Sequence, residues 1–452
     1  MQARLLPLIL ITSLLLIGSP ASAQVYEISK RTADKLPSEV ASTWFETLYD
    51  VVKTEKTTPP VASRIYGITA VALYEAIVAG ANDNRSLVGQ LNGLTLLPQP
   101  KKNKKYDWLT VANTTLAAVI RGLYPTISAP SLTAINNLEQ KFDSQFQGDA
   151  STIGYTRSVL YGQQMAAAIL AWAAGDGFAS NNNCAYIPAP VAGAWQPTTP
   201  AFNPNPLQPC WGKLRPMVLT SGGECPPPGH PAFSTSATSS FYAAALEVYN
   251  IGVGLTAEQK TIADYWADNP GATGTPAGHW IAIVSQFARG QGLSLARAAE
   301  AYARVGMAVH DAFVVCWNSK YTYNLERPVT FINDNIDRNW QPYIVTPNFP
   351  TYTSGHSTQS GAAASVLTDM FGVKRFTDMT HANHALTPAQ QPRTFNSFDE
   401  AAAEAAISRL YGGIHYSFDN NDGLGCGECV GKAIRNRVSF KSVTAAGEDA
   451  GR

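Results

Sequence analysis

Three short segments in the C-terminal part of the chain carry residue types that bind an oxyanion and exchange protons with it. They are KYTYNLERP with Lys320 and Arg327, FPTYTSGH with Ser354, Gly355 and His356, and SRLYGGIHYSFD with Arg409, His415 and Asp419. Guanidinium and ammonium groups pair with the oxygens of phosphate-like anions, and imidazole transfers protons near neutral pH. If these segments meet in space, they form a cage that binds a tetrahedral oxyanion and can do chemistry on it.

The middle segment is expected to begin a helix. Ser354 precedes STQSGAAASVLTDMFG after the Gly-His pair, and a serine in that position caps the first helical turn. The free amides of such a turn attract anions, and Gly355 lets the backbone approach the anion closely. His356 then lies in the first turn, where it can trade protons with the anion.

The third segment is expected to surround the end of another helix. A capping signal at Ser397 is followed by AAAEAAISRLYGG, which predicts that the helix stops at Gly412. Arg409 then lies in the last turn and His415 just beyond it. Asp419, four residues further on, can orient His415 through one ring nitrogen and leave the other nitrogen free.

The first segment is expected to follow a long apolar helix. Lys320 stands at the end of this helix, and Arg327 directly precedes Pro328, which disfavours helical geometry at Arg327. Two long cationic side chains that leave one helix end can share a single anion.

Apolar residues at helical spacing predict an all-α protein, because strand-like alternation is scarce and never sustained. The expected helices span residues 63–80, 110–123, 156–174, 241–266 and 294–319, besides those of the three segments. The core is expected to resemble a helical bundle with long loops.

A stretch over residues 180–231 interrupts this pattern with many Pro, Gly and Asn residues. Loops of this length are typically covering elements over a site or disordered segments. Trp195, Trp211 and the cysteines within it favour an ordered wall or lid, although a plain surface loop stays open as the alternative.

The six cysteines allow 15 pairings, and the sequence does not decide among them. The segment Cys426-Gly-Glu-Cys429 is expected to be structural.

The N-terminus has the form of a secretory signal. Arg4 precedes an apolar run from Leu5 to Ile17, and Ala21-Ser22-Ala23 resembles a cleavage site. We therefore expect residues 1–23 to be a signal peptide and residues 24–452 to form a single all-α catalytic domain, with site motifs in 310–425. The protein is expected to be secreted or periplasmic, without a membrane span after signal removal.

The balanced charge of the chain gives no overall electrostatic attraction to a polyanion. Lys plus Arg and Asp plus Glu both number 33, so no nucleic-acid partner is expected. Anion binding must come from a local cluster.

The ordered triple K-x6-RP, SGH and SR-x5-H-x3-D resembles the signature of the superfamily that joins vanadium-dependent haloperoxidases, type-2 phosphatidic acid phosphatases and bacterial acid phosphatases. The chain is most similar to the secreted bacterial haloperoxidases, including those that oxidise iodide. The motifs cover residues 320–419, and a looser similarity extends upstream through PPVASRIYG and ADNPGATGTPAGHW.

The resemblance implies vanadate as cofactor and a role for each motif residue. His415 would be the axial metal ligand and His356 the acid–base residue for hydrogen peroxide, while Lys320 would also polarise the bound peroxide. The oxygens of vanadate would be held by Lys320, Arg327, Ser354, Gly355 and Arg409. Trp317 and Phe349 would line the halide pocket, and Asp268 and Asp419 would support the site from behind.

These roles imply oxidation of iodide or bromide by hydrogen peroxide to a hypohalous species, with small organic acceptors as possible further partners. One alternative is an exported acid phosphatase in which His415 becomes a phosphohistidine. A second alternative is a non-catalytic oxyanion-binding protein, which the presence of His356 disfavours.

Overall fold

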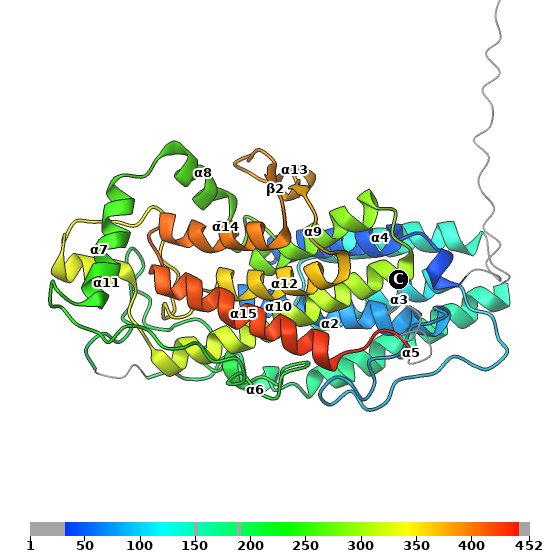
Figure 1. The fold of residues 1–452 in the computed structure, drawn as a ribbon. Helices are drawn as coiled ribbons and strands as arrows, with labels where there is room; N and C mark the ends of the chain where they lie inside the picture. The colour runs from blue at the N-terminus through cyan, green and yellow to red at the C-terminus, as the bar shows by residue number, and fades with distance from the viewer. Residues whose placement is uncertain (1–31, 149–151, 188–190, 443–452) are drawn as a thin grey trace, which may run out of the picture.

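The chain folds into an elongated bundle of helices (Figure 1). This computed structural model describes residues 32–148, 152–187 and 191–442. The predicted signal peptide, residues 1–23, lies outside them. Within the described residues the only strands are β1 (Phe376–Asp378) and β2 (Arg393–Phe395), an antiparallel pair with Phe376 opposite Phe395. The prediction of an all-α fold is confirmed.

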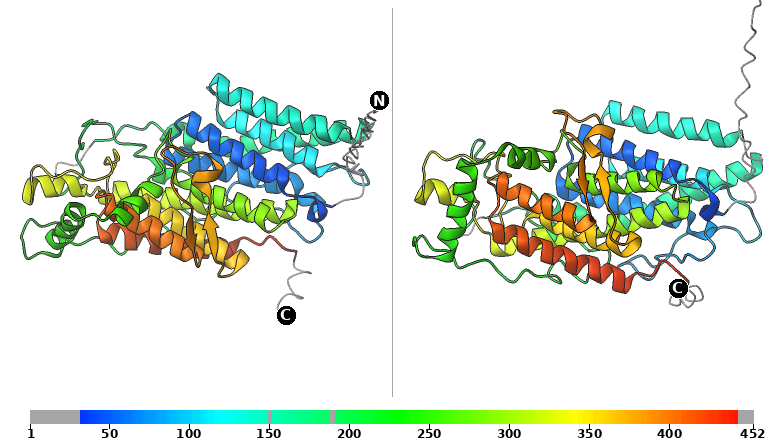
Figure 2. Two further views of the ribbon diagram at one scale, coloured as in Figure 1. Left: turned by 90° about the horizontal axis from the view of Figure 1, so that it is seen from above. Right: turned by 45° about the horizontal axis from the view of Figure 1, so that its top comes forward.

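The helices follow one another with loops of very different length. In chain order they are α1 (Glu39–Thr54), α2 (Pro59–Ile77), α3 (Trp108–Leu123), α4 (Ala129–Gln147), α5 (Thr152–Ala174), α6 (Phe178–Asn181), α7 (Ser240–Val253), α8 (Ala257–Tyr265), α9 (Thr275–Gly290), α10 (Leu295–Tyr323), α11 (Pro328–Asn335), α12 (Gly355–Phe371), α13 (Thr380–Asn383), α14 (Phe398–Tyr411) and α15 (Ser417–Arg437). In the views of Figure 2, α7 and α11 lie toward one end of the bundle and α4 and α5 toward the other.

The long helix α10 is the centre of the core and packs against α2, α12 and α15. Helix α2 is buried on nearly every face, as its uniformly apolar sequence predicts. With the 3-10 turn that follows, Pro59–Gly80 is long and apolar enough to cross a membrane, but 94% of its most apolar window is buried inside the protein. The length and apolar composition of this segment are therefore explained by its burial in the protein core.

Glycines allow α12 and α15 to pack closely. A Cβ on Gly427 of α15 would lie 2.2 Å from the carbonyl oxygen of Thr358 on α12, so the two backbones are nearly in contact. This contact sets the two helix N-termini side by side, and the Ser354 amide donates to the Asp419 carbonyl over 3.0 Å. The close packing therefore joins two of the three motif segments.

Several predicted helix boundaries were wrong. A single helix over 241–266 is in fact α7 and α8, because Gly254 ends the first and Thr256 caps the second in a reciprocal capping box with Gln259. Helices α1, α4, α9, α11 and α15 were missed. Helix α10 continues past residue 319 to Tyr323, so Lys320 lies within its last turn rather than at its end.

Two disulfides anchor the Pro-rich stretch. Cys184 pairs with Cys210 within the stretch, and Cys225 pairs with Cys429 on α15. Cys316 and Cys426 are free and buried. The CGEC segment therefore has a structural role through Cys429, as expected.

Candidate active site

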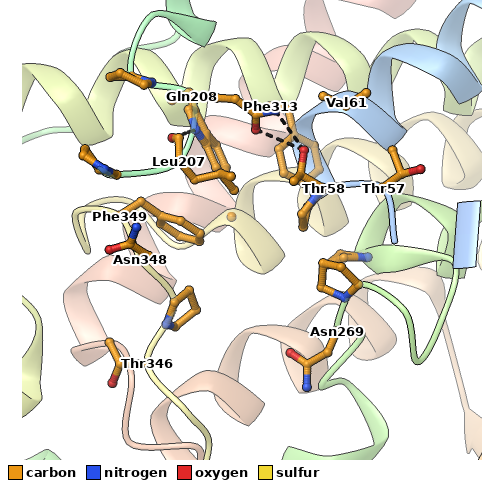
Figure 3. A pocket seen from close by; sticks show the side chains of 18 of the residues that line it. Thr57, Thr58, Val61, Leu207, Gln208, Asn269, Phe313, Thr346, Asn348 and Phe349 are labelled. Atoms are coloured by element: carbon orange, nitrogen blue, oxygen red, sulfur yellow. Dashed lines mark hydrogen bonds between the residues drawn. The ribbon is translucent and has the colours of Figure 1, made fainter. Parts of the chain in front are cut away.

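A cavity of about 1210 Å³ opens over the N-terminus of α12. The Pro-rich stretch supplies one wall of it, with residues 182–185, 203 and 205–209, which favours the predicted covering role. In Figure 3, Leu207 and Phe349 lie across the opening from Asn269. The hydrogen bond between Gln208 and Thr58 ties this wall to the start of α2.

The structure gathers the three predicted cations near the base of this cavity. Arg409 lines it, and Lys320 and Arg327 lie against Phe349 and His415, which also line it. Lys320 and Arg327 are fully buried, and Arg409 is 2% exposed. Lys320 Nζ donates to the carbonyls of Pro350 and Thr351 over 2.9 and 2.8 Å. Among the described residues, none of the three cations lies within ion-pair distance of a carboxylate. Buried positive charge without a carboxylate partner calls for an anion.

Burial lowers the pKa of each cation. The pKa of Lys320 falls to about 7 through desolvation, reinforced by the neighbouring Arg327. Desolvation also lowers the pKa of Arg327 to about 9 and that of Arg409 to about 10. An anion bound among these groups would raise the three pKa values again, because a nearby negative charge favours the protonated form of each cation.

The start of α12 has the predicted geometry. Ser354 is the N-cap, and its hydroxyl accepts from the amide of Ser357 over 3.3 Å. Gly355 and His356 occupy the first turn and line the cavity. The helix N-terminus therefore points its positive end at the same space as the cations.

His415 is fixed in one tautomer by its neighbours. Its Nδ1 lies 2.8 Å from Asp419 Oδ2, and its Nε2 lies 3.2 Å from Arg327 Nη1. A guanidinium only donates, so Nε2 must be the acceptor and Nδ1 must carry the proton. Desolvation, aided by Arg327, lowers the pKa of His415 well below its usual range, which keeps the ring neutral. A neutral imidazole whose unprotonated Nε2 is held only by an Arg327 N–H can become a metal ligand or a nucleophile when Arg327 turns to a bound anion.

The helix start of α15 holds Asp419 in place. Asp419 Oδ2 accepts from the amide of Tyr416 over 3.1 Å and also from the hydroxyl of Thr351. The Thr351 hydroxyl in turn lies 3.1 Å from His415 Nδ1. We call Arg327, Thr351, His415 and Asp419 the His415 wall.

The opposite side of the site has fewer internal contacts. Arg409 Nη1 donates to the Trp266 carbonyl over 3.0 Å, and the Trp266 backbone also raises the pKa of His356 against the effect of burial. Desolvation, then Arg409, lowers the pKa of His356 well below its usual range. We call Trp266, Asp268, His356 and Arg409 the His356 wall.

Asp268 supports Arg409 by charge. Its negative charge raises the pKa of Arg409 against the effect of burial, while its Oδ2 bonds to His279 over 2.9 Å. Its Oδ1 is buried and has no hydrogen-bond partner among the described residues. The predicted link to Arg409 is therefore electrostatic in this structure.

Trp317 and Phe349 form an aromatic pair at the cavity wall, with ring centroids 5.0 Å apart. Lys320 Nζ lies 5.0 Å from the centre of the Phe349 ring. The Trp317 Nε1 donates to the carbonyl of Leu207 over 3.1 Å, so the pair is anchored to the Pro-rich stretch. The two rings make an apolar surface beside the cations.

Sequence reasoning missed Thr351, Trp266 and His279, although all three stand in segments that drew notice. Thr351 is part of FPTYTSGH, Trp266 directly precedes ADNPGATGTPAGHW, and His279 lies within that segment. Their roles depend on partners that are distant in the chain, and no local spacing signals such partners.

Vanadate fits the residues present. Arg327 Nη2, Arg409 Nε and His356 Nε2 are buried and have no hydrogen-bond partner among the described residues. These atoms come from all three motif segments, and buried polar atoms are normally paired. A tetrahedral oxyanion supplies acceptors for the donors, and His415 Nε2 supplies the lone pair for a central metal.

The fold and the site together define the class of protein. The family described as "VCPO second helical-bundle domain" matches residues 300–442, which include all three motif segments. A solved bacterial vanadium-dependent iodoperoxidase is 35% identical, with a TM-score of 0.84, and the match covers 91% of this chain and 98% of that one. The chain belongs to the vanadium-dependent haloperoxidase family.

More distant structures share the fold alone. A bacterial vanadium-dependent chloroperoxidase in its holo form is 14% identical, with a TM-score of 0.66 and coverage of 91% and 98%. Its apo form matches equally far, at 14% identity and a TM-score of 0.65. The comparison with curated proteins returned no match.

Proposed function

We propose that this protein is a vanadate-dependent haloperoxidase that oxidises iodide with hydrogen peroxide. The observation that carries the proposal is the tautomer of His415, whose Nε2 lone pair faces a group of buried cations without carboxylate partners. The family membership and the 35% identity to an iodoperoxidase support the same function. Bromide is the second candidate halide, and small organic molecules are candidate acceptors of the hypohalous product.

Each site residue has a proposed task. When bound, vanadate supplies a Lewis acid that activates peroxide without changing its own oxidation state. Arg327, Arg409, Ser354 and the Gly355 amide hold its oxygens, and Lys320 adds positive charge where negative charge develops. His415 Nε2 donates its lone pair to the metal.

His356 handles the protons of hydrogen peroxide. Its lowered pKa keeps the ring neutral, so it can accept a proton at neutral pH, and its Nε2 has no competing partner among the described residues. Trp317 and Phe349 offer a halide an apolar, polarisable surface that favours a weakly hydrated ion such as iodide.

Export is also part of the proposal. Two disulfides in the structure suit an oxidising compartment, and the N-terminal sequence has the form of a secretory signal. We therefore propose a secreted or periplasmic location, which N-terminal sequencing of the mature protein from a native host tests directly.

One assay tests the function. Purified protein is given orthovanadate, hydrogen peroxide and iodide, bromide or chloride, and in parallel p-nitrophenyl phosphate without vanadate. We expect iodide oxidation that depends on added vanadate. Hydrolysis of p-nitrophenyl phosphate that vanadate inhibits, without any halide oxidation, would overturn the proposal in favour of a phosphatase.

A further inference from the structure

Behind the His356 wall, the imidazole of His279 bridges two carboxylates. His279 lies on α9 and is fully buried, with Nδ1 2.9 Å from Asp268 Oδ2 and Nε2 2.6 Å from Asp378 Oδ2. A neutral imidazole donates from one nitrogen only, so two carboxylate acceptors require a proton on both nitrogens. The two carboxylates accordingly raise the pKa of His279 to about 10, despite its burial. The bridge is an imidazolium.

Asp378 gives the bridge a fixed end. It closes strand β1, is fully buried, and its Oδ1 accepts from both the amide and the hydroxyl of Thr380 over 2.9 and 2.6 Å. Gln286 on α9 also donates to this oxygen over 3.3 Å. A carboxylate held by this many donors stays ionised and keeps its direction.

The other end of the bridge reaches the oxyanion site. Asp268 offers one oxygen to His279 and lines the cavity together with His356 and Arg409. The Trp266 ring stacks on His279, with centroids 4.4 Å apart and planes 20° apart, and its carbonyl accepts from Arg409. His279 therefore contacts the two residues of the His356 wall that support Arg409.

We propose that His279 is a positioning residue that holds Asp268 and Trp266 in place, so that Arg409 stays available to an oxyanion. Without the imidazolium, two buried carboxylates lose their shared cation, and Asp268 is free to turn onto Arg409 and neutralise it. An Arg409 paired with Asp268 binds an anion more weakly. The inference rests on the proposed oxyanion site but does not require halide turnover.

Binding to metal-free protein tests this role. The dissociation constants of orthovanadate and of inorganic phosphate are measured by calorimetry for wild type, His279→Gln and Asp378→Asn. We expect His279→Gln to weaken vanadate binding about 10- to 100-fold, the range typical for loss of an outer supporting partner, with Asp378→Asn between it and wild type. Folded variants that bind both anions as wild type does would overturn the proposal.

The control is His310→Gln, which removes another buried imidazole. His310 lies on α10 against Gly67 of α2 and does not line the cavity. We expect it to shift thermal unfolding while leaving the vanadate constant within about twofold. If His279→Gln does not fold, the isosteric Asp378→Asn carries the test, since it keeps the shape of the side chain and one acceptor oxygen for Thr380 and removes the charge that faces His279.

A spectroscopic readout tests the bridge itself. Nitrogen NMR of labelled histidine in wild type at pH 8 is expected to show both ring nitrogens of His279 protonated. A neutral His279 tautomer would overturn the imidazolium bridge. Wild-type protein that binds vanadate but oxidises no halide would instead refute the proposed function and leave the His279 assignment intact.

Discussion

The two walls of the site present their imidazoles in opposite ways. In the His415 wall the ring has a partner at both nitrogens, Asp419 on one side and Arg327 on the other. In the His356 wall, Nε2 of His356 is buried and unpaired among the described residues. A ring fixed at both nitrogens suits a ligand that must not move. A ring with one open nitrogen suits a group that gains and loses a proton.

Charge does not explain this difference. Burial lowers the pKa of both rings, and the nearest guanidinium adds to the effect in each case, Arg327 for His415 and Arg409 for His356. Both rings are therefore neutral in the free protein. What separates the two walls is hydrogen bonding, and substitutions can test it one wall at a time.

The largest loss is expected from His415→Ala. Removing the imidazole that would ligate the metal should abolish vanadate-dependent iodide oxidation. Vanadate binding should fall beyond the roughly 10- to 100-fold cost of losing an outer partner. Calorimetry with orthovanadate measures the change in affinity, and iodide oxidation at saturating peroxide measures the loss of turnover. A variant that retains full vanadate affinity would show that the two walls have been assigned in reverse.

His356→Ala should separate turnover from binding. We expect turnover to fall by about 10²- to 10⁴-fold, the usual contribution of a general acid–base group, because proton transfer to and from peroxide loses its partner. Vanadate affinity should change less than about tenfold, since Arg327, Arg409 and the α12 amides remain. Undiminished turnover with saturating vanadate would remove the acid–base role from the His356 wall.

Asp419→Asn should weaken the binding of vanadate at the His415 wall without abolishing it. The amide keeps the shape of the carboxylate but loses its charge, so the proton on His415 Nδ1 is less firmly held and Nε2 is a poorer ligand. We expect vanadate affinity to fall about 10- to 100-fold. The matched control is Asp422→Asn, one turn further along α15, whose carboxylate accepts from Tyr352 instead. Equal losses in the two variants would point to damage of α15 rather than to the tautomer.

The sequence predicted the parts of the site that are local. Ser354 at the start of α12, Arg409 in the last turn of α14 and His415 just after it all follow from capping and stop signals that act within a few residues. The all-α class follows from apolar spacing. Each of these features depends on neighbours in the chain.

The parts that were missed depend on long-range contacts. The role of Thr351 depends on its hydrogen bond to Asp419 of α15. The role of His279 depends on its contact with Asp378, which is 99 residues away in the chain. The break between α7 and α8 is an exception, because its signals are local: Gly254 ends α7 and a Thr256–Gln259 capping box starts α8. Apart from this break, local sequence signals found the residues that we propose to touch the anion better than the residues behind them.

The smallest effect on turnover is expected at Glu75, a buried carboxyl outside both walls. Burial raises the pKa of Glu75 to about 7, although the Leu87 amide and the Ser86 hydroxyl donate to it. Since the folded protein holds this proton more tightly than the unfolded chain, stability falls as pH rises from about 4.5 to about 7. The linkage relation converts this shift to a loss of about 3 kcal/mol.

Glu75→Gln removes this titration, and glutamine can still accept from the Leu87 amide and donate to the Ser86 hydroxyl. Chemical denaturation of both proteins between pH 4.5 and 8 should show a stability gap that grows with pH in favour of the variant, while iodide oxidation at neutral pH stays within about twofold. A gap that stays constant with pH would mean that Glu75 is ionised in the folded protein. A large loss of turnover would mean that α2 couples to the site, and the contrast between the two walls would then no longer rest on local hydrogen bonds alone.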